Sequence, residues 1–229
     1  MTVIDLELTE TQLAMQKLAR EFAEKEIKPI AAELDRVQDP AAPEAFPWEI
    51  VKKGSRLGLR TMAMPQEYGG PEVDLITKLI VLEQLGFADW SCAKIFSQVW
   101  KTVDIIAKAG TKEQKERFLP QIRDDDTYLI SIGLTEPGCG SDHTLPYEGP
   151  EGGIKLTAER KGDGYVLNGM KHFISLGAQC KLCILAARTN KALGGHKGVS
   201  VFLVSKDTPG FSVGNIHDKM ASEVTVTAS

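Results

Sequence analysis

The stretch KEQKERFLPQIRDDDTYLISIGLTEPGCGSD, residues 112–142, contains the point where the chain changes its structural period. Just before it, Thr111 and Gln114 have the spacing of a capping box, which predicts a helix start. From Tyr128 onward the period falls to two and strand-forming side chains dominate. We therefore expect helices before about residue 128 and a β-sheet after it.

The residues before this stretch predict a helical bundle. Thr9 and Gln12 form a second capping box, and apolar residues then recur at helical spacing as far as Leu34. This pattern indicates one long amphipathic helix with a bend at Pro29. Residues 64–74 are rich in Pro and Gly and predict a loop. Further helices are expected after Pro47, at Leu75, Leu79, Leu82 and Leu85, over residues 90–110, and from residue 112.

The residues after 127 contain seven candidate strands. The sequence KGDG, residues 161–164, supplies the tight turn of a hairpin. Because strands and helices do not alternate, a Rossmann domain is not expected. The predicted fold class is α+β in two domains, an all-α bundle over residues 1–127 and a truncated antiparallel β-barrel or sandwich over residues 128–229. The candidate strands are residues 128–134, 154–161, 165–175, 182–188, 199–205, 211–216 and 224–229.

Composition narrows the kinds of partner. The chain has 229 residues, 42% of them apolar, which is enough for one large domain or two modest ones. Its 27 basic and 31 acidic side chains give a net charge of -4, and no Lys/Arg block indicates nucleic acid or membrane binding. The acidic start MTVIDLELTE is unlike a signal peptide, and no run of about 18 apolar residues predicts a membrane span. We therefore expect a small-molecule ligand and a cytoplasmic location.

Four cysteines are too few for a disulfide framework in a chain of this length. Cys180 and Cys183 form a C-x-x-C, a spacing also used by zinc and redox sites. A structural zinc needs four ligands, and no second Cys pair or His pair accompanies this one. We expect both cysteines to pack as small hydrophobes where the chain enters the strand LCILAA.

The loop LTEPGCGSD, residues 134–142, is a candidate ligand-binding segment. It leaves a strand where the helical and β domains join, and such junctions commonly hold ligands. Its glycines allow close backbone approach, and the hydroxyl groups of Thr135 and Ser141 can donate hydrogen bonds to ring carbonyls or phosphate oxygens. The residues alone leave a second interpretation open, because TEPG is also an ordinary turn sequence.

The loop resembles the T-E-P-x-x-G-S-D motif of the acyl-CoA dehydrogenases. Three further stretches resemble motifs of the same family in the same order and spacing. They are AMPQEYGG at residues 63–70, GTKEQKERFLP at residues 110–120 and GDGYVLNGMKHFIS at residues 162–175. The resemblance covers nearly the whole chain and implies the family's helical first domain and β middle domain.

The resemblance implies FAD as the cofactor. Thr135 should bond the pyrimidine edge of the flavin, and Ser141 should meet the pyrophosphate. Phe173 and Ser175 occupy the family's W-I-T positions, where an aromatic ring packs beside the flavin and a hydroxyl group reaches towards N5. Without the resemblance, Phe173 reads as strand core and Ser175 as a solvated strand end. The implied cofactor-binding residues are Ile132, Leu134, Thr135, Ser141, Phe173 and Ser175.

The implied reaction is α,β-dehydrogenation of an acyl-CoA thioester. A carboxylate removes the α proton while the β hydride passes to flavin N5, and flavin and backbone donors polarise the thioester carbonyl. Reduced flavin usually passes its electrons to an electron-transfer flavoprotein. The family fold also serves flavin oxidases and monooxygenases, and a non-catalytic subunit or degenerate homologue could keep the motifs for folding alone.

The sequence departs from the family pattern in three places. The segment between Asp142 and Gly153 is about eight residues longer than the resemblance implies. Ala221 and Glu223 stand where the family usually has Gly and Arg. The family's catalytic Glu usually lies in a C-terminal helical domain that follows the residues present here. We therefore expect this chain alone to be inactive, with the base supplied by a longer chain, by a homo-oligomer or by a partner subunit.

Overall fold

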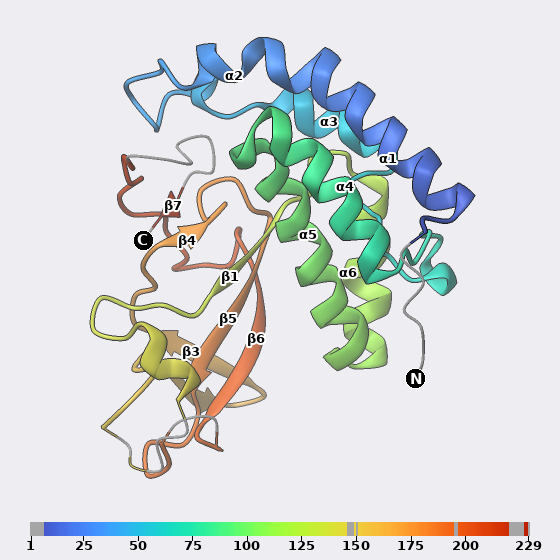
Figure 1. Cartoon of the computed structure of the whole chain (residues 1–229). Coiled ribbons are helices and arrows are strands. Elements are labelled where there is room, and N and C mark those ends of the chain that lie inside the picture. Colours follow the sequence, from blue (N-terminus) through green and yellow to red (C-terminus); the bar gives the residue numbers. More distant parts are fainter. Residues whose placement is uncertain (1–6, 146–148, 150, 195–196, 220–226, 229) are drawn as a thin grey trace. The chain divides into compact units, whose positions relative to one another are not determined.

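The computed structural model describes residues 7–145, 149, 151–194, 197–219 and 227–228. Its chain divides into two compact units (Figure 1). A helical unit comprises the described residues up to Thr127, and a sheet unit begins at Tyr128. The predicted fold class, helices followed by a sheet, is confirmed. None of the helices in the described residues is long and apolar enough to cross a membrane.

The helical unit has its helix starts where the sequence predicts them. Thr9 and Thr111 each accept a hydrogen bond from the backbone N–H three residues later, and a Gln side chain at that position bonds back to complete the capping box. Asp74 and Asp89 cap two further helices in the same way, without the returning bond. The helices are α1 (Glu10–Phe22), η1 (Ala23–Ile27), α2 (Lys28–Leu34), η2 (Pro43–Ala45), α3 (Trp48–Arg56), η3 (Gln66–Tyr68), α4 (Leu75–Ala88), α5 (Trp90–Ala109) and α6 (Lys112–Asp124).

The long first helix is confirmed, with a distortion just before Pro29. Helical backbone runs from α1 through η1 into α2, and η1 is a turn of π-helix. Lys28 donates its backbone N–H to Ala23 O, five residues back, at the point where Pro29 lacks a donor. The widened turn accommodates proline without ending the helix.

Helix α5 forms the centre of the helical unit. It packs against α3, α4 and α6, and eleven of its residues are buried. Trp100 lies among them and donates its indole N–H to Leu59 O over 2.6 Å. Helices α3 and α5 are in close contact at Gly54, where an added Cβ would lie 2.4 Å from Phe96 Cζ. The absence of a side chain at Gly54 therefore sets how closely these two helices approach.

Gly54→Ala should destabilise the helical unit by about 1–3 kcal/mol, because the clash with Phe96 exceeds the roughly 1 kcal/mol that Ala gains in helix propensity. Gly86→Ala in α4 is the matched control. Its Cβ would meet Trp90 at 3.7 Å, an ordinary contact, so we expect stabilisation of about 0.5–1 kcal/mol. Urea unfolding followed by tryptophan fluorescence measures both. Equal effects of the two substitutions would contradict the packing argument.

The sheet unit contains one five-stranded sheet and one two-stranded sheet. Strand β5 pairs with β1 on one side and with β6 on the other, and β2 meets the end of β5 at Thr157 and Arg188 before pairing with β3. Strands β4 and β7 pair separately. The strands are β1 (Ile130–Gly133), β2 (Thr157–Lys161), β3 (Gly164–Asn168), β4 (Ile174–Ser175), β5 (Leu182–Arg188), β6 (Val199–Ser205) and β7 (Thr227–Ala228).

The expectation of purely antiparallel pairing is wrong for β1 and for the contact of β2 with β5. The pairs β2–β3, β5–β6 and β4–β7 are antiparallel, but β1 runs parallel to β5, with Ile130 opposite Leu182, and β2 meets β5 in parallel at Thr157 and Arg188. The chain between these strands forms the β2–β3 hairpin of the same sheet and then β4, and it enters β5 in the direction of β1. A parallel pair needs such a long crossover, and here its described residues contain strands and no α-helix.

Two further strand predictions need correction. The expected strand over residues 165–175 is two strands, β3 and β4, separated where Gly169 has a φ of 143° and Phe173 a φ of 56°. These conformations end a regular ladder. Residues 211–215 form no strand. Of the predicted strand 224–229, residues 227 and 228 form β7, and residues 224–226 and 229 lie outside the described residues, as do Ala221 and Glu223.

Cys180 and Cys183 pack in the core as predicted. Both are free thiols, and they form a buried cluster with Leu185. Burial raises the pKa of Cys183 to about 12 and raises that of Cys180 as well. Ser131 Oγ lies 3.2 Å from Cys180 Sγ. The thiols are therefore protonated at neutral pH and behave as small core side chains.

Candidate cofactor site

The T-E-P loop is a rigid turn at the end of β1. Glu136 N–H donates to Cys139 O over 2.8 Å, and Cys139 N–H donates back to Glu136 O over 3.1 Å. This bridge closes a turn at Pro137 and Gly138. The interpretations of TEPG as an ordinary turn and as a ligand-binding loop are therefore compatible, because a tight turn can also present fixed groups to a ligand.

A buried ion pair anchors this loop. Glu136 and Lys171 have side chains 5% and 6% exposed, and Lys171 Nζ donates to Glu136 Oε1 over 2.7 Å. The carboxylate also accepts the backbone N–H groups of Lys155 and Leu156, over 2.7 and 2.9 Å. Lys171 Nζ donates a further bond to Leu134 O over 3.1 Å. The pair thus joins the T-E-P loop, the start of β2 and the segment before β4.

Two electrostatic effects shift the pKa of Lys171 in opposite directions. Burial lowers the pKa of Lys171, and the hydrogen bond and charge of Glu136 raise it. The net direction is downward, so desolvation of the ammonium outweighs the attraction to its partner. A buried ion of this kind stays in place only because every charged atom has hydrogen-bond partners.

The segment KHFIS, residues 171–175, lies directly beside the T-E-P loop. His172 donates its backbone N–H to Thr135 O over 2.8 Å. The next residue, Phe173, has a left-handed backbone and a side chain that is largely exposed, with 59% of the residue's surface accessible. Left-handed backbone is costly for a bulky residue and is enriched at functional sites. The structure therefore brings together two segments that are 37 residues apart and holds an aromatic ring on their surface.

Two histidines surround the Phe173 ring. Its centroid lies 3.9 Å from that of His172 and 4.9 Å from that of His217, and the two imidazoles are 4.7 Å apart. His217 comes from the segment after β6 and was not predicted as a site residue. No local sequence signal marks it, because its place beside Phe173 depends on the tertiary path of that segment.

The remaining predicted residues lie on or next to β1, on β4 and at the start of a short helix. Ile132 lies on β1 opposite Ile184, and Leu134 packs against the cluster that contains Cys139 and Leu156. Ser175 lies on β4, and Ser141 is exposed at the start of the short helix η4 (Ser141–Thr144). A backbone hydrogen bond links Thr135 to the Phe173 segment, and Ser175 pairs with Thr227 of β7.

Asp142 fixes the loop that follows Thr135. Its carboxylate accepts the backbone N–H of Gly140 over 2.7 Å and that of Gly153 over 3.0 Å. The Gly153 bond, with help from Gly140, lowers the pKa of Asp142 below its usual value. The carboxylate is therefore ionised at neutral pH and holds the chain on both sides of the long segment after Ser141. Part of that segment, residues 146–148 and 150, lies outside the described residues.

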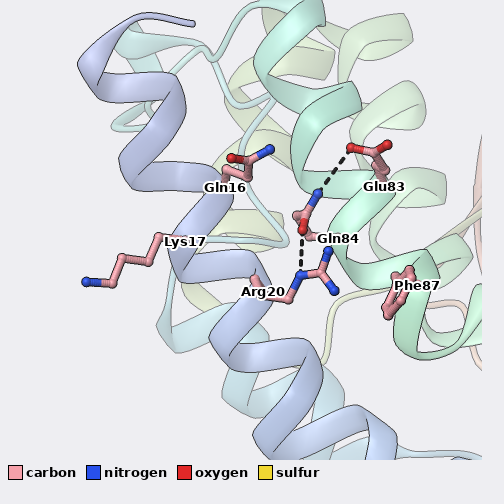
Figure 2. Close-up of a pocket in the computed structure, with 6 residues that line it drawn as sticks. All are labelled: Gln16, Lys17, Arg20, Glu83, Gln84 and Phe87. Atoms are coloured by element: carbon pink, nitrogen blue, oxygen red, sulfur yellow. Dashed lines mark hydrogen bonds between the residues drawn. The ribbon is translucent and has the colours of Figure 1, made fainter.

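The helical unit has a separate surface pocket of about 590 Å³ that contains none of the predicted residues. In Figure 2, Arg20 from α1 points towards Gln84 and Phe87 of α4, whereas Lys17 points away. Arg20 Nε donates to Gln84 Oε1 over 2.7 Å, and its guanidinium lies 4.4 Å from the centroid of the Phe87 ring. The hydrogen bond and the cation–π contact join Arg20 to α4 across this pocket. These contacts hold α1 against α4.

Family models match almost the whole chain. The acyl-CoA dehydrogenase N-terminal domain matches residues 9–126, and the acyl-CoA dehydrogenase middle domain matches residues 131–228. The chain belongs to the acyl-CoA dehydrogenase family. The second match includes the T-E-P loop, the buried ion pair and the Phe173 segment.

Individual relatives agree with this family. The chain is 37% identical over 227 residues to the acryloyl-CoA reductase (NADH) of Anaerotignum propionicum, covering 98% of this chain and 54% of that protein. It matches the structure of butyryl-CoA dehydrogenase from Megasphaera elsdenii with a TM-score of 0.83 at 30% identity, covering 98% and 56%. A glutaryl-CoA dehydrogenase from Mycobacterium smegmatis, solved in complex with FADH2, matches with a TM-score of 0.80 at 26% identity, covering 96% and 52%. The chain spans about half the length of these relatives.

In this acyl-CoA dehydrogenase family member, Lys171→Met should destabilise the sheet unit by about 3–5 kcal/mol, because it leaves the buried carboxylate of Glu136 without its counter-charge. Lys191→Met is the matched control. Lys191 pairs with Glu159 at 2.6 Å, but both side chains are well exposed, so a loss of about 0–1 kcal/mol is expected. Amide hydrogen exchange of β1 and β5 measures the loss of stability in both variants. A small effect at Lys171 would show that the pair does not anchor the loop.

Proposed function

We propose that this chain binds FAD through its T-E-P loop and Phe173 segment and serves flavin-dependent oxidation or reduction of acyl-CoA thioesters. The observation that carries the proposal is the bond from His172 N–H to Thr135 O, backed by the Glu136–Lys171 pair. These contacts join the two segments that the family resemblance associates with the flavin. Residues 1–127 and 128–229 are proposed as the family's N-terminal and middle domains.

The side chains present suit a flavin. The exposed Phe173 ring offers an apolar face, and the half-buried Thr135 adjoins it through the His172 bond. In the proposed site, Thr135 donates to the pyrimidine edge, Ser141 bonds the pyrophosphate and Ser175 approaches N5. Ile132 and Leu134 add apolar surface, and Phe173 excludes water from one side. When bound, FAD would supply the group that accepts a hydride in oxidation or, in its reduced form, donates one in reduction.

The substrate chemistry needs one group that these two domains do not supply. Removal of the α proton requires a carboxylate within hydrogen-bond reach of the substrate. The resemblance assigns this base to the family's C-terminal helical domain, and the two matched models are those of the N-terminal and middle domains. We propose that the base comes from outside residues 1–229, from a longer chain, a homo-oligomer or a partner subunit. An electron-transfer flavoprotein is the proposed electron acceptor.

The direction of the reaction has two candidates. Dehydrogenation of a saturated acyl-CoA follows from the motif resemblance. Reduction of an α,β-unsaturated acyl-CoA is the second candidate, because a relative at 37% identity is an acryloyl-CoA reductase. Both use the same Cα–Cβ bond against the same flavin, so the residue roles above apply to either.

Removing the predicted hydroxyl groups should weaken FAD binding. Thr135→Val loses a neutral hydrogen bond and should weaken affinity about 2- to 10-fold, and Ser141→Ala loses a bond to a charged group and should weaken it about 10- to 100-fold. Ser200→Ala on β6, where Ser200 Oγ bonds Thr189 Oγ at 2.9 Å, is the control and should leave affinity unchanged. Titration followed by flavin fluorescence gives the FAD dissociation constant of each of the three variants. Retention of wild-type affinity in the Thr135/Ser141 double variant would overturn the site assignment.

The 229-residue chain supplied with FAD should not turn over acyl-CoAs at an enzymatic rate, because the proposed base lies outside it. The assay combines the purified chain with FAD, a series of saturated acyl-CoAs and an artificial electron acceptor. Unsaturated acyl-CoAs with a reductant test the other direction. Sustained turnover with no added polypeptide would show that the base lies within these residues, and an oxygen-reactive reduced flavin would favour an oxidase or monooxygenase.

A further inference from the structure

The Phe173 ring is not held in place by burial. The residue is 59% exposed, so the core encloses little of its side chain. Its φ of 56° is costly for a bulky residue and persists only where surrounding contacts impose it. On one side His172 N–H donates to Thr135 O, and on the other Ile174 is buried on β4. These contacts fix the backbone and leave the direction of the ring to other groups.

Two imidazoles contact the ring, and they differ in the segment that carries them. The His172 centroid lies 3.9 Å from that of Phe173, but His172 is the preceding residue and belongs to the same short segment. The His217 centroid lies 4.9 Å away, and His217 belongs to the segment after β6. That segment has its own anchors, because Phe211 packs against the buried cysteine cluster and Ile216 makes a β-bridge. His217 therefore supports the ring from a separately anchored part of the sheet unit.

The arrangement of the three rings suits such a support. The His217 imidazole is inclined at 42° to the Phe173 ring and at 83° to the His172 ring, whose centroid is 4.7 Å from its own. Aromatic rings favour offset and edge-to-face contacts at such separations. His217 is half-buried, whereas the next residue, Asp218, is exposed. One imidazole thus contacts both other rings and limits the rotation of the Phe173 side chain.

We propose that His217 is a positioning residue for the flavin and that it acts through Phe173. The inference rests on the proposed function, in which Phe173 excludes water from one side of the cofactor. A ring that His217 already holds in one orientation loses less conformational entropy when FAD binds. A ring that rotates freely would lose more, and FAD affinity would fall. His217 needs no contact of its own with the flavin for this effect.

FAD titration of the purified 229-residue chain tests the proposal. His217→Ala should weaken FAD affinity about 2- to 10-fold, the range expected for one aromatic contact. His217→Phe keeps a ring and should restore most of the affinity, whereas His217→Gln keeps only polar atoms and should resemble His217→Ala. Tyr165→Ala is the matched control and should leave affinity unchanged, because Tyr165 forms an edge-to-face pair with Phe202 at 5.2 Å, outside the proposed site. Restoration by Gln and not by Phe would overturn the proposal.

A double-mutant cycle with Phe173→Ala separates positioning from a general structural role. If His217 acts through Phe173, His217→Ala causes no further loss of FAD affinity in the Phe173→Ala background. Equal losses in both backgrounds would show that His217 acts independently of the ring, which contradicts the inference. Wild-type affinity in both single variants would remove the inference and leave FAD binding by the T-E-P loop in place.

Nuclear magnetic resonance of the FAD-free chain, with isotope-labelled phenylalanine, tests the contact between the two residues by itself. Phe173→Leu identifies the Phe173 ring signals by their loss. Those signals should shift in His217→Ala, because the imidazole no longer lies beside the ring, and should stay in place in Tyr165→Ala. Unmoved signals in His217→Ala would overturn the inference, whatever the result with FAD. A wild-type chain that shows the contact but binds no FAD would overturn the proposed function instead.

Discussion

The Glu136–Lys171 pair is the interaction on which the proposed flavin site depends. A buried ion pair adds little stability by itself, because desolvation offsets the attraction between the charges. Here, however, the carboxylate also accepts two backbone N–H groups at the start of β2, and the ammonium donates to the carbonyl before Thr135. Apolar replacements of both side chains would leave those backbone groups buried without partners. The pair is therefore required by the backbone around it.

Two glycines make room for this arrangement. A Cβ on Gly133 would lie 2.3 Å from Leu185 Cδ2 and 3.1 Å from Lys171 Cγ, so the lysine stem crosses β1 where β1 has no side chain. A Cβ on Gly169 would lie 2.8 Å from the Cα of Leu156, and the φ of 143° is one that only glycine adopts readily. Gly133 and Gly169 thus allow the T-E-P loop, the start of β2 and the segment before β4 to meet.

Local signals predicted the helical unit well. The capping boxes at Thr9 and Thr111 involve side chains three residues apart, so a single sequence contains the whole interaction. The sheet depended on distant contacts and was predicted less completely. Nothing near β1 indicates that its partner lies about 50 residues later and runs parallel to it.

The proposed flavin site was also predicted only in part, because it too depends on contacts between distant residues. Motif resemblance pointed to Thr135 and Phe173, but the groups that hold them together were not predicted. Glu136 and Lys171 find each other across 35 residues, and His217 reaches the Phe173 ring from a segment 44 residues later. These partners become visible only when the chain is folded.

The residues proposed to bind flavin are held by several contacts at once. In the sheet unit, Thr135 and Phe173 are placed by backbone bonds, a bridged turn and a buried ion pair, so most substitutions that move them also cost stability. Substitutions that test the proposed flavin binding should therefore remove a single hydroxyl group, as Thr135→Val and Ser141→Ala do, and leave the Glu136–Lys171 pair in place.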